Sequence, residues 1–304
     1  MQAAPELKPL GVGDIVDRVF SIYRARFVPL IAIASIPYLL LVLSIVGITF
    51  AFGGAVIAVL SAAIEPRAAG LGRLEGLVSQ PGVILQLLVW FVLVIVISLA
   101  VGLVQSAALV AAVAARYMGR DTTVGEALRS GLRASPRLLV MGLIASLAIA
   151  GLWMALAIFM GVFSQWWSIA LGLLAGFVGM TYIAASWMVS PPVAILEGAG
   201  PVTALRRSWY LSGGHRWRIL GLILLLLILQ GVLSSLLSFV LIASLVADRG
   251  VQVALQQAVN LLASIAWAPI YWGTFAILYY DLRVRKEALD LQLAVEALPR
   301  ETSS

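Results

Sequence analysis

His215 is the only histidine of the sequence, and it lies in the segment Gly213-Gly214-His215-Arg216-Trp217. An imidazole could act as a general acid or base, or as the middle member of a Ser–His–acid triad. Either role needs a carboxylate or a nucleophile held against the ring, and the residues beside His215 indicate neither. Cysteine is absent, which excludes thiol chemistry and Cys-ligated metal. We therefore expect no enzyme, no metal site and no cofactor, and interpret His215 as a residue near lipid headgroups.

Polar side chains recur every four residues in the last two long apolar segments. The two rows are Gln230, Ser234 and Ser238, then Gln256, Asn260 and Ser264. A spacing of four keeps side chains on one face of a helix. The short connection Asp248-Arg249-Gly250 would let the rows meet. This polar seam has two interpretations, which are hydrogen bonds between helices worth about 0.6 kcal/mol each and the lining of a cavity; we favour the first.

A group of charged residues near the third and fourth polar segments is the other candidate site. It consists of Glu197, Arg206, Arg207, Asp281, Arg283, Arg285, Glu287 and Asp290. One interpretation is contact with anionic lipid headgroups, at roughly 1 kcal/mol for each basic residue near the surface. The other is a docking site for a protein partner, in which the acids pair with the arginines. The mixed sign of the charges favours pairing over a purely basic lipid patch.

The elements that must position these residues are membrane spans. Of the 304 residues, 62% are hydrophobic and 11% are charged, whereas about 25% are charged in a typical soluble domain. This composition excludes a soluble enzyme, a nucleic-acid-binding domain and a secreted disulfide scaffold. We therefore predict an all-α integral membrane protein that forms a single domain over residues 1–304.

Stretches without Asp, Glu, Lys or Arg set the number of spans. The longest covers residues 138–196 and would measure about 90 Å as one helix, so it must turn back, most simply at residues 163–168. A break at Gly53-Gly54 could add a seventh span, but the charge distribution argues against it. The six predicted spans are 28–52, 84–114, 138–161, 168–194, 219–246 and 253–280.

The basic residues predict the orientation of these spans. Six spans place the segments 1–26, 116–137, 197–218 and 281–304 on one side, and these hold 17 of the 20 Lys and Arg. Positive residues are retained on the cytoplasmic face. We expect a multi-pass protein of the cytoplasmic (inner) membrane with both termini in the cytoplasm. Residues 1–14 lack the pattern of a cleavable signal peptide.

The segments on the basic side resemble one another. Residues 14–26, 124–135 and 202–212 each precede a span and, the third less cleanly, alternate apolar and charged residues with the period of an amphipathic helix. We predict that they lie in the membrane interface, with Phe20, Leu128 and Leu205 facing apolar groups. Ser135-Pro136 and Gly213-Gly214 are expected to end the second and third helices. The predicted repeat units are about 12–82, 124–196 and 202–280, each an interfacial helix followed by a hairpin of two spans, and residues 281–304 form an amphipathic tail.

Four sequence features also resemble a known family. They are Gly13-Asp14-Ile15-Val16-Asp17-Arg18, Pro191-Pro192 with Glu197, Arg206-Arg207-Ser208-Trp209, and Tyr280-Asp281-Leu282-Arg283 with Asp290. Together they are similar to the bacterial glycerophosphoryl diester phosphodiesterase membrane-domain family. The resemblance implies a multi-span membrane protein. It does not imply phosphodiester hydrolysis, because the chain ends at Ser304 without the length for the phosphodiesterase barrel.

Two functions follow from these observations. The first is a non-catalytic scaffold or accessory protein that contacts the bilayer, anionic headgroups and a protein partner at the cytoplasmic face. The second is a permease or channel-like protein for a small neutral or lipid-like substrate. No ionisable side chain lies inside a predicted span, which argues against a proton-coupled pump.

Overall fold

The computed structural model describes residues 9–64, 72–73, 75–77, 79–163, 165–240, 249–290 and 292. These residues are almost entirely helical, and no strand occurs among them. In chain order the helices are α1 (Val12–Ala25), α2 (Phe27–Phe52), α3 (Gly54–Ile64), α5 (Pro81–Tyr117), α6 (Val124–Phe163), α7 (Trp166–Trp187), α8 (Ser190–Leu196), α9 (Pro201–Ser212), α10 (Arg216–Val240) and α11 (Arg249–Glu287).

Six helical stretches of the described chain are long and apolar enough to cross a membrane, as predicted. They are Phe27–Ala51, Pro81–Tyr117, Val124–Phe163, Trp166–Leu196, Arg216–Ser238 and Ala254–Glu287. The predicted break is present at Gly53, between α2 and α3, and a Cβ there would collide with the carbonyl oxygen of Thr49, so the position suits glycine. Among the described residues the break adds no span, since α3 has 11 residues there and a span needs about 20.

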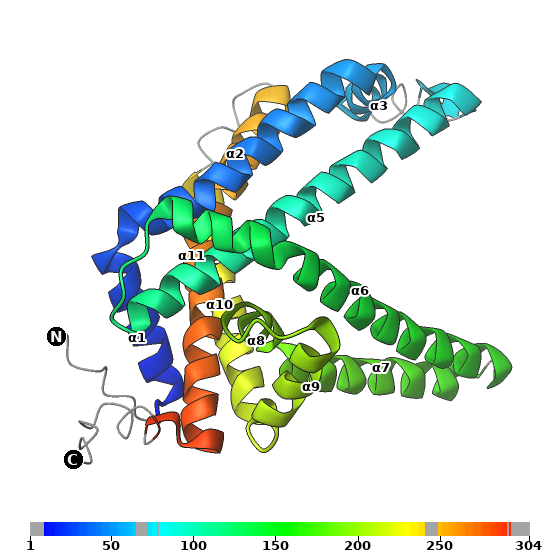
Figure 1. The fold of residues 1–304 in the computed structure, drawn as a ribbon. Helices are drawn as coiled ribbons and strands as arrows, with labels where there is room; N and C mark the ends of the chain where they lie inside the picture. The colour runs from blue at the N-terminus through cyan, green and yellow to red at the C-terminus, as the bar shows by residue number, and fades with distance from the viewer. Residues whose placement is uncertain are drawn as a thin grey trace, which may run out of the picture.

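Helix α11 is the centre of the molecule (Figure 1). It packs against α5, α1, α2 and α10, and the residues from Phe275 to Leu282 are all buried. Two pairs of long helices project from this centre: α2 and α5, and α6 and α7 (Figure 1). Their outer surfaces are covered with exposed aliphatic and aromatic side chains, as expected of helices that face lipid.

The predicted end of a helix at Ser135-Pro136 is wrong. Residues 124–135 are helical, but they continue without a break into the span, and Pro136 lies inside α6. A proline at this position cannot donate to the carbonyl oxygen of Leu132. The hydroxyl of Ser135 donates to that oxygen at 2.9 Å, so the carbonyl stays satisfied and the helix continues.

Two other predicted boundaries also differ. Residues 281–287 do not begin a separate tail, because α11 continues through Asp281 to Glu287 and ends where Ala288 takes a positive φ of 49°. The span predicted at 168–194 is divided by a turn at Met188–Val189, and the short helix α8 starts at Ser190 with the prolines 191–192 in its first turn. Residues 293–304 lie outside the described part, as do residues 65–71, 74 and 78 between the first two predicted spans.

Two of the three segments predicted as interfacial helices are separate helices. They are α1, which ends before the irregular residue Arg26, and α9, which ends at Gly213-Gly214 with a φ of 82° at Gly214. Phe20 and Leu128 pack against the buried core, and Leu205 is buried within it, as predicted. Placement in the membrane interface stays a prediction, as does the threefold repeat.

Candidate functional site

Five side chains from α9, α11 and the segment after α8 form one charged network. Arg207 is its centre, because the guanidinium forms an ion pair with Glu197 and binds Glu287, with Nη1 2.9 Å from Oε1. Arg283 donates from Nε to Oε2 of Glu287 at 2.9 Å, and the hydroxyl of Tyr279 donates to Oε1 of Glu197 at 2.8 Å. We call Glu197, Arg207, Tyr279, Arg283 and Glu287 the first network.

The first network keeps the guanidinium of Arg207 positively charged although that group is partly buried. Burial by itself would lower the pKa of the Arg207 guanidinium. Hydrogen bonds and the negative charges of Glu197 and Glu287 outweigh burial and raise that pKa above its ordinary value. Arg207 therefore stays protonated and joins α9 to the end of α11.

A second network ties the N-terminal segment to α10 and α11. The Asp281 side chain is 0% exposed, and its Oδ2 lies 2.5 Å from Nη1 of Arg218 and 3.1 Å from Nε of Arg285. Its Oδ1 accepts a hydrogen bond from the backbone N–H of Leu10 at 2.7 Å. Both arginines also donate to the carbonyl oxygen of Leu10. We call Asp281, Arg218, Arg285 and the Leu10 backbone the second network.

The structure thus divides the predicted charge cluster. Glu197, Arg207, Arg283 and Glu287 meet in the first network, and Asp281 and Arg285 belong to the second. Neither network includes Arg206 or Asp290. Sequence reasoning missed Tyr279, Arg218 and the backbone of Leu10. Arg218 was counted only as one of the basic residues beside a span, and nothing in the sequence marks the Leu10 backbone.

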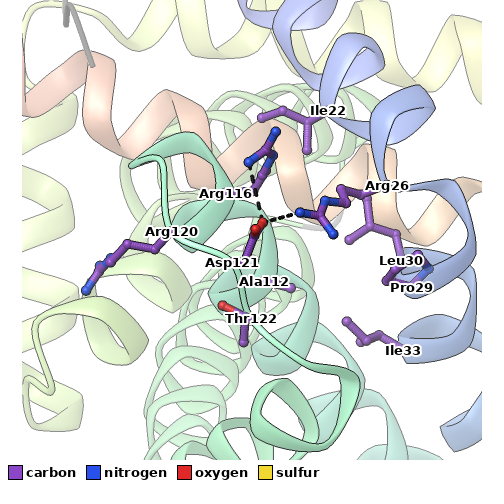
Figure 2. Close-up of a pocket in the computed structure, with 10 residues that line it drawn as sticks. All are labelled: Ile22, Arg26, Pro29, Leu30, Ile33, Ala112, Arg116, Arg120, Asp121 and Thr122. Atoms are coloured by element: carbon purple, nitrogen blue, oxygen red, sulfur yellow. Dashed lines mark hydrogen bonds and ion pairs between the residues drawn. The ribbon is translucent and has the colours of Figure 1, made fainter. Parts of the chain in front are cut away.

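A third charged contact joins the α1–α2 junction to the α5–α6 turn (Figure 2). Asp121 forms an ion pair with Arg26 and lies 3.4 Å from Nη1 of Arg116, while Arg120 points away from it. The cavity beside this contact has a volume of about 30 Å³, which is enough for one or two water molecules. The Asp121 side chain is 64% exposed, so this pair contributes about 1 kcal/mol at most.

Four of the six residues of the predicted polar seam line one cavity. Gln230 and Ser234 of α10 face Asn260 and Ser264 of α11 across a cavity of about 180 Å³, which Trp267 also lines. Gln256 donates to Oδ1 of Asn260 at 3.3 Å along the same helix, and neither Gln256 nor Ser238 lines this cavity. Trp267 is 6% exposed, and its indole N–H has no hydrogen-bond partner among the described residues.

His215 lies in the turn between α9 and α10, beside the second network. Burial, followed by the positive charges of Arg285, Lys286 and Arg218, lowers the pKa of its imidazole. The folded protein therefore binds fewer protons at this site than the unfolded chain, whose histidine pKa is about 6.5. Stability should fall as the pH drops through that value, since protonation favours the unfolded chain.

His215→Gln should remove this part of the acid sensitivity. The variant and the native protein should unfold alike at pH 8, and the variant should lose less of its thermal stability between pH 7 and pH 5. Thermal unfolding in detergent at several pH values measures this. Parallel pH profiles for both proteins would show that His215 does not contribute.

The six long apolar helices identify the chain as a multi-pass membrane protein. Residues 157–292 match the sequence model of a family described as the membrane domain of glycerophosphoryl diester phosphodiesterase. The resemblance predicted from the sequence is confirmed over these residues, which include both networks except for Leu10, and the polar seam. The segment at residues 13–18, which was the first of the four features that resemble the family, lies outside the matched residues. No curated protein and no solved structure matches the chain.

Proposed function

We propose that this membrane protein is a non-catalytic scaffold or accessory protein that docks a protein partner at the cytoplasmic face. In this proposal it resides in the inner membrane with both termini in the cytoplasm, and its basic residues also contact anionic headgroups. The distribution of charge supports this orientation, because 17 of the 20 basic residues belong to the segments on the side of the two networks.

The exposed face of α9 is the observation that carries the proposal. Arg206 is exposed, and Tyr210 and Trp209 are 55% and 39% exposed. Arginine, tyrosine and tryptophan are the residue types that most often dominate binding energy at protein interfaces. We call Arg206, Trp209 and Tyr210 the α9 face.

The opposite side of α9 holds this face in place. Ser208 is buried and donates from its hydroxyl to the carbonyl oxygen of Ser186 at 2.7 Å. Arg207 joins the helix to α11 through the first network. A surface that is rigid before binding loses less entropy on association. The carboxylates of both networks accept hydrogen bonds from arginines, which supports a structural role for them rather than a role in proton transfer.

Site-specific photo-cross-linking in intact cells tests the docking proposal. A photo-reactive amino acid at Tyr210 should give one discrete protein adduct. The same amino acid at Trp166, which is 80% exposed at the far end of α7, is the matched control and should give no such adduct. The adduct at Tyr210 should disappear when Arg206→Glu reverses the charge of the α9 face. Adducts to lipid alone, or the same adducts at both positions, would contradict the proposal.

A permease is the second candidate, and the cavity between α10 and α11 favours it. Four amide and hydroxyl side chains surround a space large enough for several waters or a small neutral molecule. The indole N–H of Trp267, which also lines it, has no hydrogen-bond partner among the described residues. If the seam only joins helices, Asn260→Leu should cost on the order of 1 kcal/mol. It should then leave water access unchanged.

Water access along the seam separates the two candidates. Cysteines introduced singly at Gln230, Asn260 and Leu262 can be tested with a water-soluble thiol reagent in membranes. Labelling at Gln230 and Asn260 without labelling at the exposed, apolar position Leu262 would support a wet cavity. If all three positions resist the reagent, the permease is wrong and the seam is structural.

A further inference from the structure

An apolar groove lies between α7 and α10, outside both networks and the polar seam. Its volume is about 850 Å³. Side chains of both helices line it, among them Phe177 of α7 and Leu224 and Leu227 of α10. These three side chains are each more than half exposed. The groove therefore offers a large apolar surface that other parts of the described chain leave uncovered.

One end of the groove carries a cation held in a fixed position. Arg216 donates from Nε to the hydroxyl of Ser186 at 2.8 Å. Its guanidinium carbon lies 4.4 Å from the ring centroid of Tyr182 and 4.9 Å from that of Trp209. Stacking of this kind orients the guanidinium plane while its terminal nitrogens remain able to donate.

The charge of Arg216 is not neutralised within the described residues. Arg207, Arg218, Arg283 and Arg285 each pair with a carboxylate, whereas no described carboxylate forms an ion pair with Arg216. A guanidinium has five N–H donors, and only its Nε has a hydrogen-bond acceptor among the described residues. Arg216 is therefore available to bind a negative group from outside this part of the chain.

The length of the groove matches one leaflet of a bilayer. Arg216 and Leu227 stand at its two ends along α10, and 11 residues of helix rise about 16 Å. Half of the hydrocarbon core of a membrane is about 15 Å thick. Trp217, beside Arg216, is 88% exposed, and tryptophan is enriched at the level of the headgroups. An anionic headgroup at Arg216 would thus place its acyl chains along the walls of the groove.

We propose that this groove binds one anionic phospholipid, with the phosphate on Arg216 and an acyl chain against Phe177, Leu224 and Leu227. The lipid belongs to the leaflet on the side of Arg216, which is the inner leaflet in the orientation proposed above. A free phosphate would leave the apolar walls uncovered, and an apolar partner helix would leave Arg216 without a counter-charge. An anionic phospholipid would cover the apolar walls with an acyl chain and pair its phosphate with Arg216.

Native mass spectrometry of the delipidated protein in detergent tests the proposal. The titration uses a phosphatidylglycerol and, separately, a phosphatidylcholine with the same acyl chains. The protein should bind one phosphatidylglycerol about tenfold more tightly than phosphatidylcholine. Arg216→Gln should weaken phosphatidylglycerol binding about tenfold, as expected when a charge-assisted contact is lost. Arg133→Gln removes an exposed arginine of α6 outside the groove and should not change the affinity.

A second variant keeps the test decisive if Arg216→Gln does not fold. Leu224→Trp fills the groove without changing any charge and should also abolish the tight binding of phosphatidylglycerol. Equal affinity for both lipids, equal losses from Arg133→Gln and Arg216→Gln, or unchanged binding by Leu224→Trp would each overturn the proposal. Displacement of phosphatidylglycerol by millimolar inorganic phosphate would also overturn it.

Discussion

Asp281→Asn should lower the free energy of unfolding by about 3–5 kcal/mol. The carboxylate is fully buried between Arg218 and Arg285 and also accepts the backbone N–H of Leu10. Neutralising it leaves two guanidinium groups facing each other without a counter-charge, and breaking a buried ion pair in this way costs energy of that size. Denaturant or thermal unfolding in detergent measures the loss.

Asp290→Asn is the matched control, because Asp290 lies near the same end of α11 but belongs to neither network. Its effect should stay within about 0.5 kcal/mol. Asp281→Asn should also loosen the N-terminal segment, since the backbone N–H and carbonyl oxygen of Leu10 bind groups of the second network. Faster proteolysis near Leu10 would report that loosening. If the two variants are equally stable, the second network does not hold the fold together.

Arg207→Gln should cost about 2 kcal/mol, because hydrogen bonds to charged groups contribute about 1.5–3 kcal/mol and this guanidinium is partly solvated. Removing it leaves Glu287 with Arg283, and Glu197 with the hydroxyl of Tyr279. In the native protein burial would raise the pKa of the Glu287 carboxyl, but hydrogen bonds and positive charges of Arg283 and Arg207 outweigh it and lower that pKa, so this carboxylate contributes stability above its unfolded pKa. Without Arg207 the pKa of Glu287 should rise, and the loss relative to the native protein should be larger at pH 8 than at pH 5.

Arg206→Gln provides the comparison for this result, since it removes an equal charge from the exposed side of the same helix. Its stability should match that of the native protein at both pH values. Unfolding curves of the three proteins at pH 5 and pH 8 are sufficient for the comparison. A loss for Arg207→Gln that is the same at both pH values would show that Arg207 does not lower the pKa of Glu287.

The spans could be predicted because the bilayer imposes one strong requirement on sequence. A helix that crosses it needs about 20 apolar residues, and the turn at residues 163–168 and the break at Gly53 follow from the same pattern of polar and small residues. Helix ends were harder to predict. Helix α6 continues through Pro136, and the hydroxyl of Ser135 satisfies the carbonyl oxygen that the proline leaves free.

The sequence was sufficient to predict most residues of the charged site, but not which of them form ion pairs. Arg283 and Glu287 are four residues apart on one helix, a spacing that brings side chains together. Glu197, Arg207 and Glu287 meet only because α9 packs beside the end of α11, which no local pattern encodes. The Leu10 backbone and Arg216 were missed for the same reason, since tertiary packing alone determines what each of them contacts.

Labelling of single cysteines in intact cells tests the proposed orientation most directly, and the docking surface and the inner-leaflet site both depend on it. The native chain has no cysteine, so a membrane-impermeant thiol reagent reports only the introduced position. Cysteines at Arg206 and Ser304 should stay unlabelled until the membrane is permeabilised, whereas a cysteine at Trp166 should be labelled from outside. Labelling of Arg206 or Ser304 from outside, with protection of Trp166, would place the two networks on the wrong side of the membrane for the proposed function.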